Sequence, residues 1–467
     1  MIKRLRPMLI LAGIAVVLGI VLWVLVAFVL PKDEAGEEKG NAIALIATDI
    51  SEADSVKVEN TFDTYTLVKE AIGSYYIDGK KGYTVNNTAV ETFLEKLSAL
   101  SASRKLVEEP TAEQLEGYGL STPNGTITVV NDDDQYVITL GTTSASGNYY
   151  CQIAGDPAVY LVDTSVPNTA LLSRYQFYSS QMVEYDANAD NATELTAFTI
   201  GGTGREQEVQ CIEQELADDE VGTTFIMTAP FRHSFSSAMH SELTTMLTAL
   251  SSCPVVGDDT SAEALAELGL DDPVYILRYT LSGEDKEIYF GKVNASGYQY
   301  CYEPSGKFIY YVEESAIDML GYSIKEYCED LVYSRAADEL AHIKITGSGK
   351  TYNIDVGEQD KNTGEFNVTI NNKSVNSESF SDFYAHIITI AITDLGEKAA
   401  NSECILTATF TLTDGTVETL KFYPVSELKC FCERDGSGQF WVSRLSVERI
   451  LENAQKLYDG EVITLEW

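Results

Sequence analysis

The chain has 467 residues, of which 32 are lysine or arginine and 71 are aspartate or glutamate, and its formal net charge is −39 at pH 7. A surface this acidic repels nucleic acid and anionic lipid, so nucleic acid is not expected as a partner. The length exceeds what one hydrophobic core usually serves, because domains of about 100 to 150 residues are the commonest size.

An apolar segment lies near the N-terminus. Residues 8–30 carry no charged side chain, and about 20 apolar residues are enough to cross the core of a bilayer as a helix. Basic residues precede this segment and acidic residues follow it: Lys3, Arg4, Arg6, Asp33, Glu34, Glu37 and Glu38. The positive-inside rule then places the N-terminus in the cytoplasm and the bulk of the chain outside. We predict a cytoplasmic tip and single-pass anchor over residues 1–31 and an acidic linker over 32–41.

A cleaved signal peptide is the alternative interpretation of this segment. Its apolar region would be about 7 to 15 residues long, which is shorter than residues 8–30. Ala35-Gly36 leaves a late cleavage site open, so the sequence does not decide whether the anchor is retained.

Three further stretches have the pattern of α+β modules, over residues 42–184, 193–334 and 338–467. Each begins with an alternating strand and a second hairpin arm, followed by a helix. The apolar residues at helical spacing are Phe93, Leu97 and Leu100 in the first module, Leu243, Leu247 and Leu250 in the second, and Phe380, Phe383, Ile387 and Ile390 in the third. We predict that each module is an antiparallel sheet with a helix packed across one face.

The first two modules repeat one motif at a constant spacing. Leu115–Leu120 (LEGYGL) returns 150 positions later as Leu265–Leu270 (LAELGL), and the same shift relates Pro123 to Pro273, Gly141 to Gly291, Gly147 to Gly297, Cys151 to Cys301 and Tyr160 to Tyr310. One offset kept over so many residues indicates a repeated structural unit. Thr111 and Ser261 are the expected N-caps of a short helix before each motif. The third module lacks the motif but keeps the strand meander that follows it, over residues 406–412, 416–422, 428–432 and 440–442.

These residues resemble the bacterial domain of unknown function 4340 family. The resemblance rests on the N-terminal anchor and on Phe93–Leu97, Glu116–Leu120 with Pro123, Ile138–Gly141 and Val159–Val162. It covers the first two modules, whereas in the third only the meander, with Trp441 at the tyrosine position, supports it. The resemblance implies an extracytoplasmic repeat protein, often encoded beside an ABC-type export permease and a gliding-type auxiliary subunit, and it implies no catalytic residue.

Residues with the chemistry of catalysis or metal binding form no recognisable pattern. The four histidines, His233, His240, His342 and His386, make no His-x-x-x-His pair. Cys151, Cys301 and Cys432 hold equivalent positions in separate modules, so we expect buried thiols rather than disulfides between them. Gly201–Gly204 lacks the lysine of a phosphate-binding loop and is expected to be a hairpin turn. Asp186–Asp190 lacks the glycine and the glutamate of a calcium loop and is expected to be a linker. We therefore predict no catalytic residue, no cofactor and no metal site.

Tyrosine supplies the candidate contact residues. Tyr298, Tyr300 and Tyr302 alternate along one expected strand, so their rings should share a face, and Tyr310 follows on the next strand. Such a stripe can stack on sugar rings or grip a partner protein. Half-buried strands also favour tyrosine, which gives the same pattern a structural explanation.

Three functional hypotheses follow. The leading one is a non-enzymatic, membrane-anchored, extracytoplasmic interaction protein that is accessory to an ABC-type export or gliding-type envelope complex, with an ABC permease and its auxiliary subunit as partners. The second is a binding module for a carbohydrate, wall fragment or peptide on the tyrosine-bearing sheet. The third is an exported hydrolase with scattered catalytic carboxylates, although no spacing in the sequence favours it. The oligomeric state is not predicted.

Overall fold

A computed structural model describes residues 42–186, 194–215 and 223–463. The predicted anchor and acidic linker fall in residues 1–41, outside the described part. Among the described residues, no helix is both long enough and apolar enough to cross a membrane. The chain divides into two compact units between Ser179 and Ser180. The fold is mixed α+β and contains three antiparallel sheets, as the sequence predicts.

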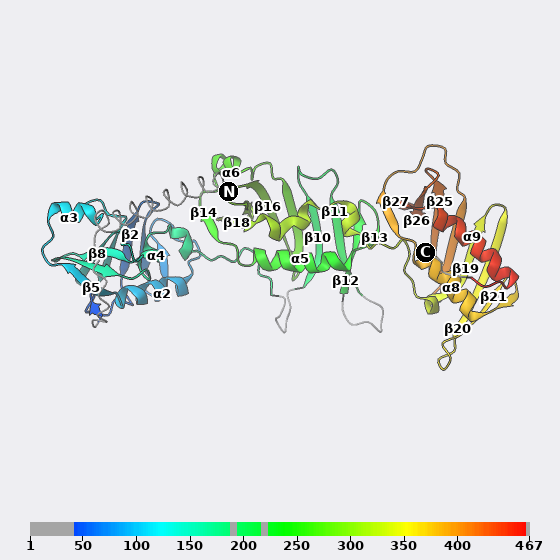
Figure 1. Cartoon of the computed structure of the whole chain (residues 1–467), viewed down its shortest axis with the longest axis horizontal. Helices are drawn as coiled ribbons and strands as arrows, with labels where there is room; N and C mark the ends of the chain where they lie inside the picture. The colour runs from blue at the N-terminus through cyan, green and yellow to red at the C-terminus, as the bar shows by residue number, and fades with distance from the viewer. Residues whose placement is uncertain (1–41, 187–193, 216–222, 464–467) are drawn as a thin grey trace, which may run out of the picture. The chain divides into compact units, whose positions relative to one another are not determined.

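The first unit contains a nine-stranded sheet, called sheet one. Its strands, in spatial order, are β1 (Ile43–Ala44), β5 (Ser101–Val107), β9 (Asp156–Val162), β8 (Tyr149–Ile153), β7 (Asp134–Thr143), β6 (Gly125–Asn131), β2 (Ser55–Asn60), β3 (Thr64–Lys69) and β4 (Tyr75–Ile77). Its helices are α2 (Asn87–Ser98), α3 (Ala112–Gly117), α4 (Pro167–Ala170) and η3 (Arg174–Phe177). Helix α2 lies along one face of the sheet (Figure 1), and Phe93 and Leu97 are buried, as the helical spacing predicts.

Sheet two, in the second unit, is also nine-stranded. Its strands, in spatial order, are β13 (His233–Ser234), β12 (Thr223–Ala229), β11 (Val209–Glu215), β10 (Leu195–Gly201), β15 (Tyr275–Leu281), β16 (Glu284–Val293), β17 (Tyr298–Tyr302), β18 (Ile309–Glu313) and β14 (Val255–Gly257). Its helices are α5 (Ser237–Leu250), α6 (Ala262–Leu268), η4 (Glu314–Gly321) and α7 (Ile324–Tyr327). Helix α5 buries Leu243, Leu247 and Leu250, which the sequence places on its apolar face.

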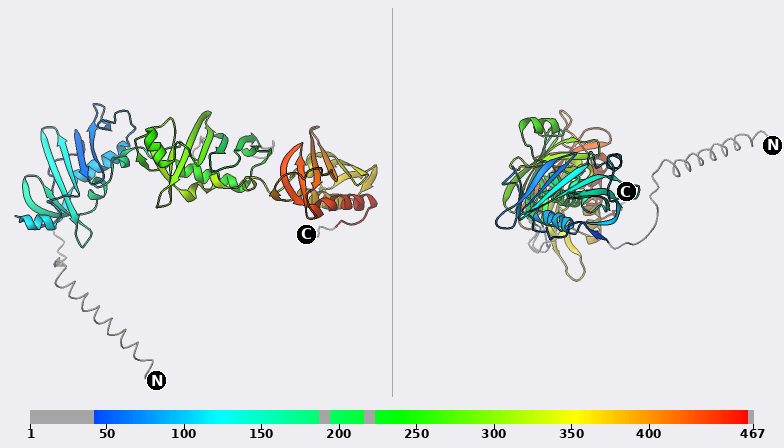
Figure 2. Two further views of the ribbon diagram at one scale, coloured as in Figure 1. Left: turned by 90° about the horizontal axis from the view of Figure 1, so that it is seen from above. Right: turned by 90° about the vertical axis from the view of Figure 1, so that its left-hand side faces the viewer.

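Sheet three completes the second unit. Its strands, in spatial order, are β22 (Lys373–Val375), β21 (Phe366–Ile370), β20 (Lys350–Gln359), β19 (Leu340–Gly347), β24 (Leu406–Leu412), β25 (Val417–Pro424), β26 (Lys429–Arg434), β27 (Ser437–Ser443) and β23 (Ile392–Leu395). Its helices are η5 (Ala337–Glu339), α8 (Ser377–Ile388) and α9 (Arg444–Asp459). Helix α8 buries Phe380, Phe383 and Ile387, and α9 lies beside the strands of this sheet (Figure 2).

The three sheets share the order of eight of their nine strands. The ninth strand is β1, beside β5, in sheet one, but β13, beside β12, in sheet two and β22, beside β21, in sheet three. The strand that opens each sheet pairs with the first strand of the meander, as β2 with β6, β10 with β15 and β19 with β24. The short strand after the main helix pairs with the last strand of the meander, as β5 with β9, β14 with β18 and β23 with β27. Sheet three therefore has the topology of sheet two, and eight strands in common with sheet one, although its sequence lacks the repeated motif.

The incoming chain is tied to the main helix in the same way each time. The N–H of Leu45 donates to the carbonyl of Leu100 at 3.0 Å, that of Val183 to Leu250 at 3.3 Å, and that of Val332 to Ile390 at 3.1 Å. Each acceptor lies just past, or at, the end of the helix. In the second module the bond satisfies one of the last helical carbonyls, which have no partner within the helix. In the first and third modules it satisfies a carbonyl two residues beyond the helix.

The repeated motif lets the end of the short helix pack closely against the sheet. Thr111 and Ser261 cap α3 and α6, as the sequence predicts. Just beyond these helices, Gly119 and Gly269 have φ of 69° and 70°, a left-handed conformation that glycine adopts without steric cost. Gly141 in β7 and Gly291 in β16 face the carbonyl oxygens of Tyr118 and Leu268, and a Cβ at either glycine would clash with that oxygen.

Sheet three replaces the glycine with a side chain. The register places Phe422 opposite Cys432, as Leu140 lies opposite Cys151 and Phe290 opposite Cys301. Tyr423 therefore stands where Gly141 and Gly291 stand in the other sheets. Nζ of Lys398, from the segment between β23 and β24, lies 4.2 Å from the centre of the Tyr423 ring.

One sequence alignment in sheet three is wrong by one position. Cys151 pairs with Tyr160 and Cys301 with Tyr310, whereas Cys432 pairs with Phe440. Phe440, and not Trp441, is the structural equivalent of these tyrosines. A shift of one residue moves a side chain to the other face of a sheet, so Trp441 faces Gly396 and donates from its indole to the carbonyl of Glu397 at 3.1 Å.

We expect the Gly141→Ala substitution to destabilise the first unit by about 1 to 3 kcal/mol, the usual range for overpacking. The added methyl group would meet the carbonyl of Tyr118 and push α3 from the sheet. Gly117→Ala is the matched control, because a Cβ there has no atom within 4 Å and alanine favours a helix. Urea unfolding of the first unit would measure both; equal midpoints for the two variants would contradict the close-approach explanation.

Candidate functional site

The four tyrosines singled out by the sequence do not share one surface. Tyr298, Tyr300 and Tyr302 alternate along β17, while Tyr310 pairs with Cys301 and therefore shares the opposite face with it. Tyr302 and Tyr310 are buried, at 8% and 7% exposed. Tyr302 packs with Leu270 and Ile309 in a small core, against which Tyr300 also packs. Tyr298 lies against the ring of Tyr311, with centroids 4.6 Å apart.

The polar face of each sheet is the surface that the three modules have in common. Buried and more exposed residues alternate along the central strands, so one face packs in the core and the other meets solvent. At equivalent positions on this polar face, a basic residue lies beside a threonine on the adjacent strand. The pairs are Lys57 with Thr128, Thr199 with Arg278, and Lys344 with Thr409.

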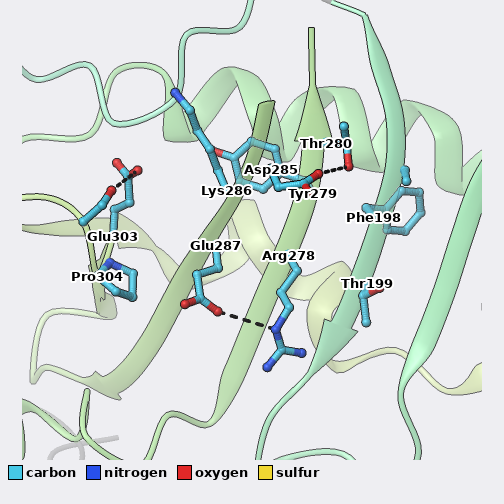
Figure 3. Close-up of a pocket in the computed structure, with 12 residues that line it drawn as sticks. Phe198, Thr199, Arg278, Tyr279, Thr280, Asp285, Lys286, Glu287, Glu303 and Pro304 are labelled. Carbon is cyan, nitrogen blue, oxygen red and sulfur yellow. Dashed lines mark hydrogen bonds and ion pairs between the residues drawn. The ribbon is translucent and has the colours of Figure 1, made fainter. Parts of the chain in front are cut away.

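Sheet two carries a hollow around the second of these pairs, which we call the Arg278 cavity. Its volume is about 760 Å³. Strands β10, β15 and β16 and the turn between β17 and β18 line it (Figure 3). The lining residues are Ala197, Phe198, Thr199, Arg278, Tyr279, Thr280, Asp285, Lys286, Glu287, Glu303, Pro304 and Ser305. Sequence reasoning missed these residues, because they belong to no motif and come together only through strand pairing.

The charged side chains of the Arg278 cavity are already paired. The Arg278 guanidinium lies 3.5 Å from the Glu287 carboxylate and 3.4 Å from that of Glu208. The Thr280 hydroxyl donates to Asp285 at 2.6 Å, and the Ser305 hydroxyl donates to Glu303 at 2.8 Å; Figure 3 shows both bonds. Lys286 contacts Glu284 at 3.7 Å. The result is a hollow in which three carboxylates and two cations are each hydrogen-bonded or ion-paired.

Tyr279 forms the buried part of the cavity wall and is 3% exposed. Its hydroxyl has no hydrogen-bond partner among the described residues. Burial, and then the nearby charge of Glu303, raise the pKa of Tyr279 above its ordinary value. Burial therefore disfavours the phenolate, which is the nucleophilic form of tyrosine.

The histidines take part in structural contacts. Nε2 of His233 lies 2.9 Å from the carbonyl of Glu329, and Nε2 of His386 lies 2.9 Å from that of Ser446. His342 contacts Asp355 at 2.8 Å through Nδ1, and the ring of His240 packs on Phe225. Within the described ranges, no three His, Cys, Asp or Glu side chains are placed to hold a metal ion.

The thiols are mostly buried and hold equivalent positions in the three cores. Cys151, Cys301 and Cys432 are each fully buried, and burial raises the pKa of Cys151 to about 12 and that of Cys430 to about 11. A thiolate is the reactive form of cysteine, so these thiols are poor nucleophiles. Cys404 is the exposed cysteine.

Two regions of the chain, residues 76–256 and 233–408, match the model of a domain of unknown function, DUF4340. The matched regions together cover sheet two and reach into sheets one and three. No curated protein matches the chain, and no solved structure does.

We expect a maleimide reagent to label the folded protein at Cys404 first, because the other seven cysteines are buried. After unfolding, all eight should react. Peptide mass spectrometry after a short pulse, with and without denaturant, would make the comparison. Labelling of Cys301 or Cys432 in the native protein as fast as Cys404 would show that these cores open readily.

Proposed function

The chain belongs to the domain of unknown function 4340 family, and we propose that it is a non-enzymatic interaction protein held at the outer surface of a bacterial membrane. Residues 8–30 act as a single-pass anchor in this proposal, with the N-terminus in the cytoplasm. The support is the uncharged length of this segment and the basic residues before it.

The observation that carries the proposal is the polar face repeated on three sheets that share the order of eight strands. A core needs only one face of each sheet, and a threonine with a basic neighbour recurs at the same place on the other face. Protein interfaces that form and dissociate are about as polar as ordinary surface. A row of such faces suits a protein that docks with others through several modules.

The partners we propose are an ABC-type permease and its auxiliary subunit, as the family resemblance implies. The acidic charge of the chain supports a partner with a basic surface, because complementary charge speeds association and selects among partners. Sheet two is the proposed point of contact, since the Arg278 cavity is lined by groups of both charge signs.

Binding of a small polar ligand, such as a saccharide or a wall-derived peptide, is the second candidate function. The Arg278 cavity favours it, because ligand sites usually enclose about 300 to 1,000 Å³. This hypothesis moves from Tyr298, Tyr300 and Tyr302 to the cavity, whose charged and hydroxyl groups suit a ligand with hydroxyl groups.

Hydrolysis is the weakest of the three hypotheses. Asp285, Glu287 and Glu303 line the cavity, and a pair of carboxylates is what a glycoside hydrolase needs. A catalytic acid is kept protonated by apolar surroundings. These carboxylates instead accept hydrogen bonds or pair with Arg278.

We expect a photo-crosslinking residue at Thr280 to capture the permease or its auxiliary subunit in native membranes, whereas the same residue at Glu242, on the exposed side of α5, should capture neither. Arg278→Glu should lower the yield at Thr280 at least tenfold, because three carboxylates would then face one another. Lys361→Glu, the same change of charge on an exposed turn of sheet three, is the matched control and should leave the yield unchanged.

Mass spectrometry of the captured chains distinguishes the outcomes. A transport subunit recovered in stoichiometric amount supports the accessory function. Recovery of the protein alone, in membranes where a known complex survives the detergent, contradicts that function and leaves the small-ligand hypothesis. An anchor-deleted chain, which should remain soluble, tests whether residues 8–30 hold the protein at the membrane.

A further inference from the structure

His233 lies at the contact between sheets two and three of the second unit. Its ring centroid is 4.7 Å from that of Phe440 in β27, and the Phe231 ring meets Phe440 edge-on at 4.9 Å. Phe440 is fully buried, and His233 is 2% exposed. The contact between the two sheets therefore packs an imidazole and a phenyl ring from sheet two against one phenyl ring from sheet three.

The hydrogen bonding of His233 defines its charge in this contact. Nε2 lies 2.9 Å from the Glu329 carbonyl, and since a carbonyl only accepts, Nε2 carries the proton. Nδ1 is buried and has no hydrogen-bond partner in the described part of the chain, so the imidazole is neutral. A proton added to Nδ1 would be a buried N–H without an acceptor, which is unfavourable because it loses its bond to water.

Charged groups surround this position on several elements. Glu329 lies on the segment after α7 and Arg434 on β26, and both act on His233. The adjoining hollow of about 690 Å³ is also lined by Arg232, Arg335, Asp338, Glu339, Glu418 and Asp435. Burial lowers the pKa of His233, and the charge of Arg434 adds to this, against the opposing effects of Glu329.

Glu418 is the buried carboxylate of this region, at 8% exposed. Burial opposes its ionisation, but the hydrogen bond from Arg335, the charge of Arg434 and that of Arg335 lower the pKa of Glu418 below its ordinary value. The contact distances are 3.0 Å to Arg335 and 3.3 Å to Arg434. Glu418 therefore stays ionised at pH 5, where a solvated histidine is already protonated.

We propose that the contact between sheets two and three is an acid-sensitive joint, in which protonation of His233 releases the rings of Phe231 and His233 from Phe440. The proton binds more strongly to His233 in the open form, where water solvates the imidazolium. The contact is therefore complete above the ordinary histidine pKa of about 6.5 and weakens as the pH falls below it. One linked proton changes the ratio of closed to open forms by up to about tenfold per pH unit.

The main-chain connection between the sheets persists in acid. The N–H of Val332 donates to the Ile390 carbonyl at 3.1 Å, and that of Ile392 donates to the Asp330 carbonyl at 2.7 Å. Neither bond involves a titratable group. Sheet three therefore stays connected to sheet two while the ring contact opens. Acid then changes how freely sheet three moves relative to sheet two, and leaves its fold unchanged. This joint operates whichever partner the protein has.

Distance measurement by electron paramagnetic resonance on the full chain in mild detergent tests the joint. Spin labels on unnatural amino acids at Glu284 in sheet two and Lys361 in sheet three, both exposed, report the separation of the sheets without using the cysteines. We expect a narrow distribution at pH 7.5 and a second, broader population that grows between pH 6.5 and pH 5. Circular dichroism at both pH values should show unchanged secondary structure.

Two histidine variants separate the joint from general acid effects. His233→Gln keeps a donor for the Glu329 carbonyl but cannot become charged, so its distribution should be the same at both pH values. His240→Gln, at an exposed position on α5, should respond as the parent protein does. If His233→Gln does not fold, nuclear magnetic resonance titration of labelled histidine in the parent chain replaces it, and His233 should then titrate below the ordinary range. A distribution unaffected by pH in the parent protein, or a pH response retained in His233→Gln, would overturn the proposal.

Discussion

Packing of one amphipathic helix on one face of an antiparallel sheet is the interaction on which each of the three sheets depends. Burying a phenylalanine or leucine side chain stabilises a fold by about 1.5 to 3 kcal/mol, and α2, α5 and α8 each bury several such residues. Ion pairs on the solvent face, such as Arg278 with Glu287, contribute about 0 to 1 kcal/mol. The apolar face therefore specifies the fold, and the polar face is left free to vary in composition.

The sheets differ where a short segment packs on the polar face, over the second strand of the meander. Gly141 and Gly291 let the ends of α3 and α6 approach the backbone of the sheet. Tyr423 occupies the same place in sheet three, and an extended segment with Gly396 beneath Trp441 takes over. The strand order survives this exchange because the buried face, with Cys151, Cys301 and Cys432 at one position, is unaffected. A family signature can thus be lost from one copy while the topology stays.

Most cysteine and histidine side chains of the described residues are buried or hydrogen-bonded within the fold, so binding would have to use the surfaces of the sheets. Burial disfavours the thiolate of Cys151 and Cys430, and His386 holds α8 to the start of α9 through the Ser446 carbonyl. His233 differs, because it lies where sheets two and three meet and its Nδ1 has no hydrogen-bond partner among the described residues. Its ionisation would act on the joint rather than on a bound molecule.

The local periodicities were enough to predict the helices around Phe93 and Leu247, the caps at Thr111 and Ser261 and the antiparallel meanders, because these depend on neighbours within a few residues. The repeat also predicted equivalent buried cysteines. Strand register was beyond sequence reasoning. It depends on contacts between distant residues, and an error of one residue exchanged Phe440 for Trp441. Sequence reasoning also provided no register for Tyr310, which lies on the face opposite Tyr300. The Arg278 cavity and the His233 contact arise from such long-range pairing, so only the tertiary structure determined them.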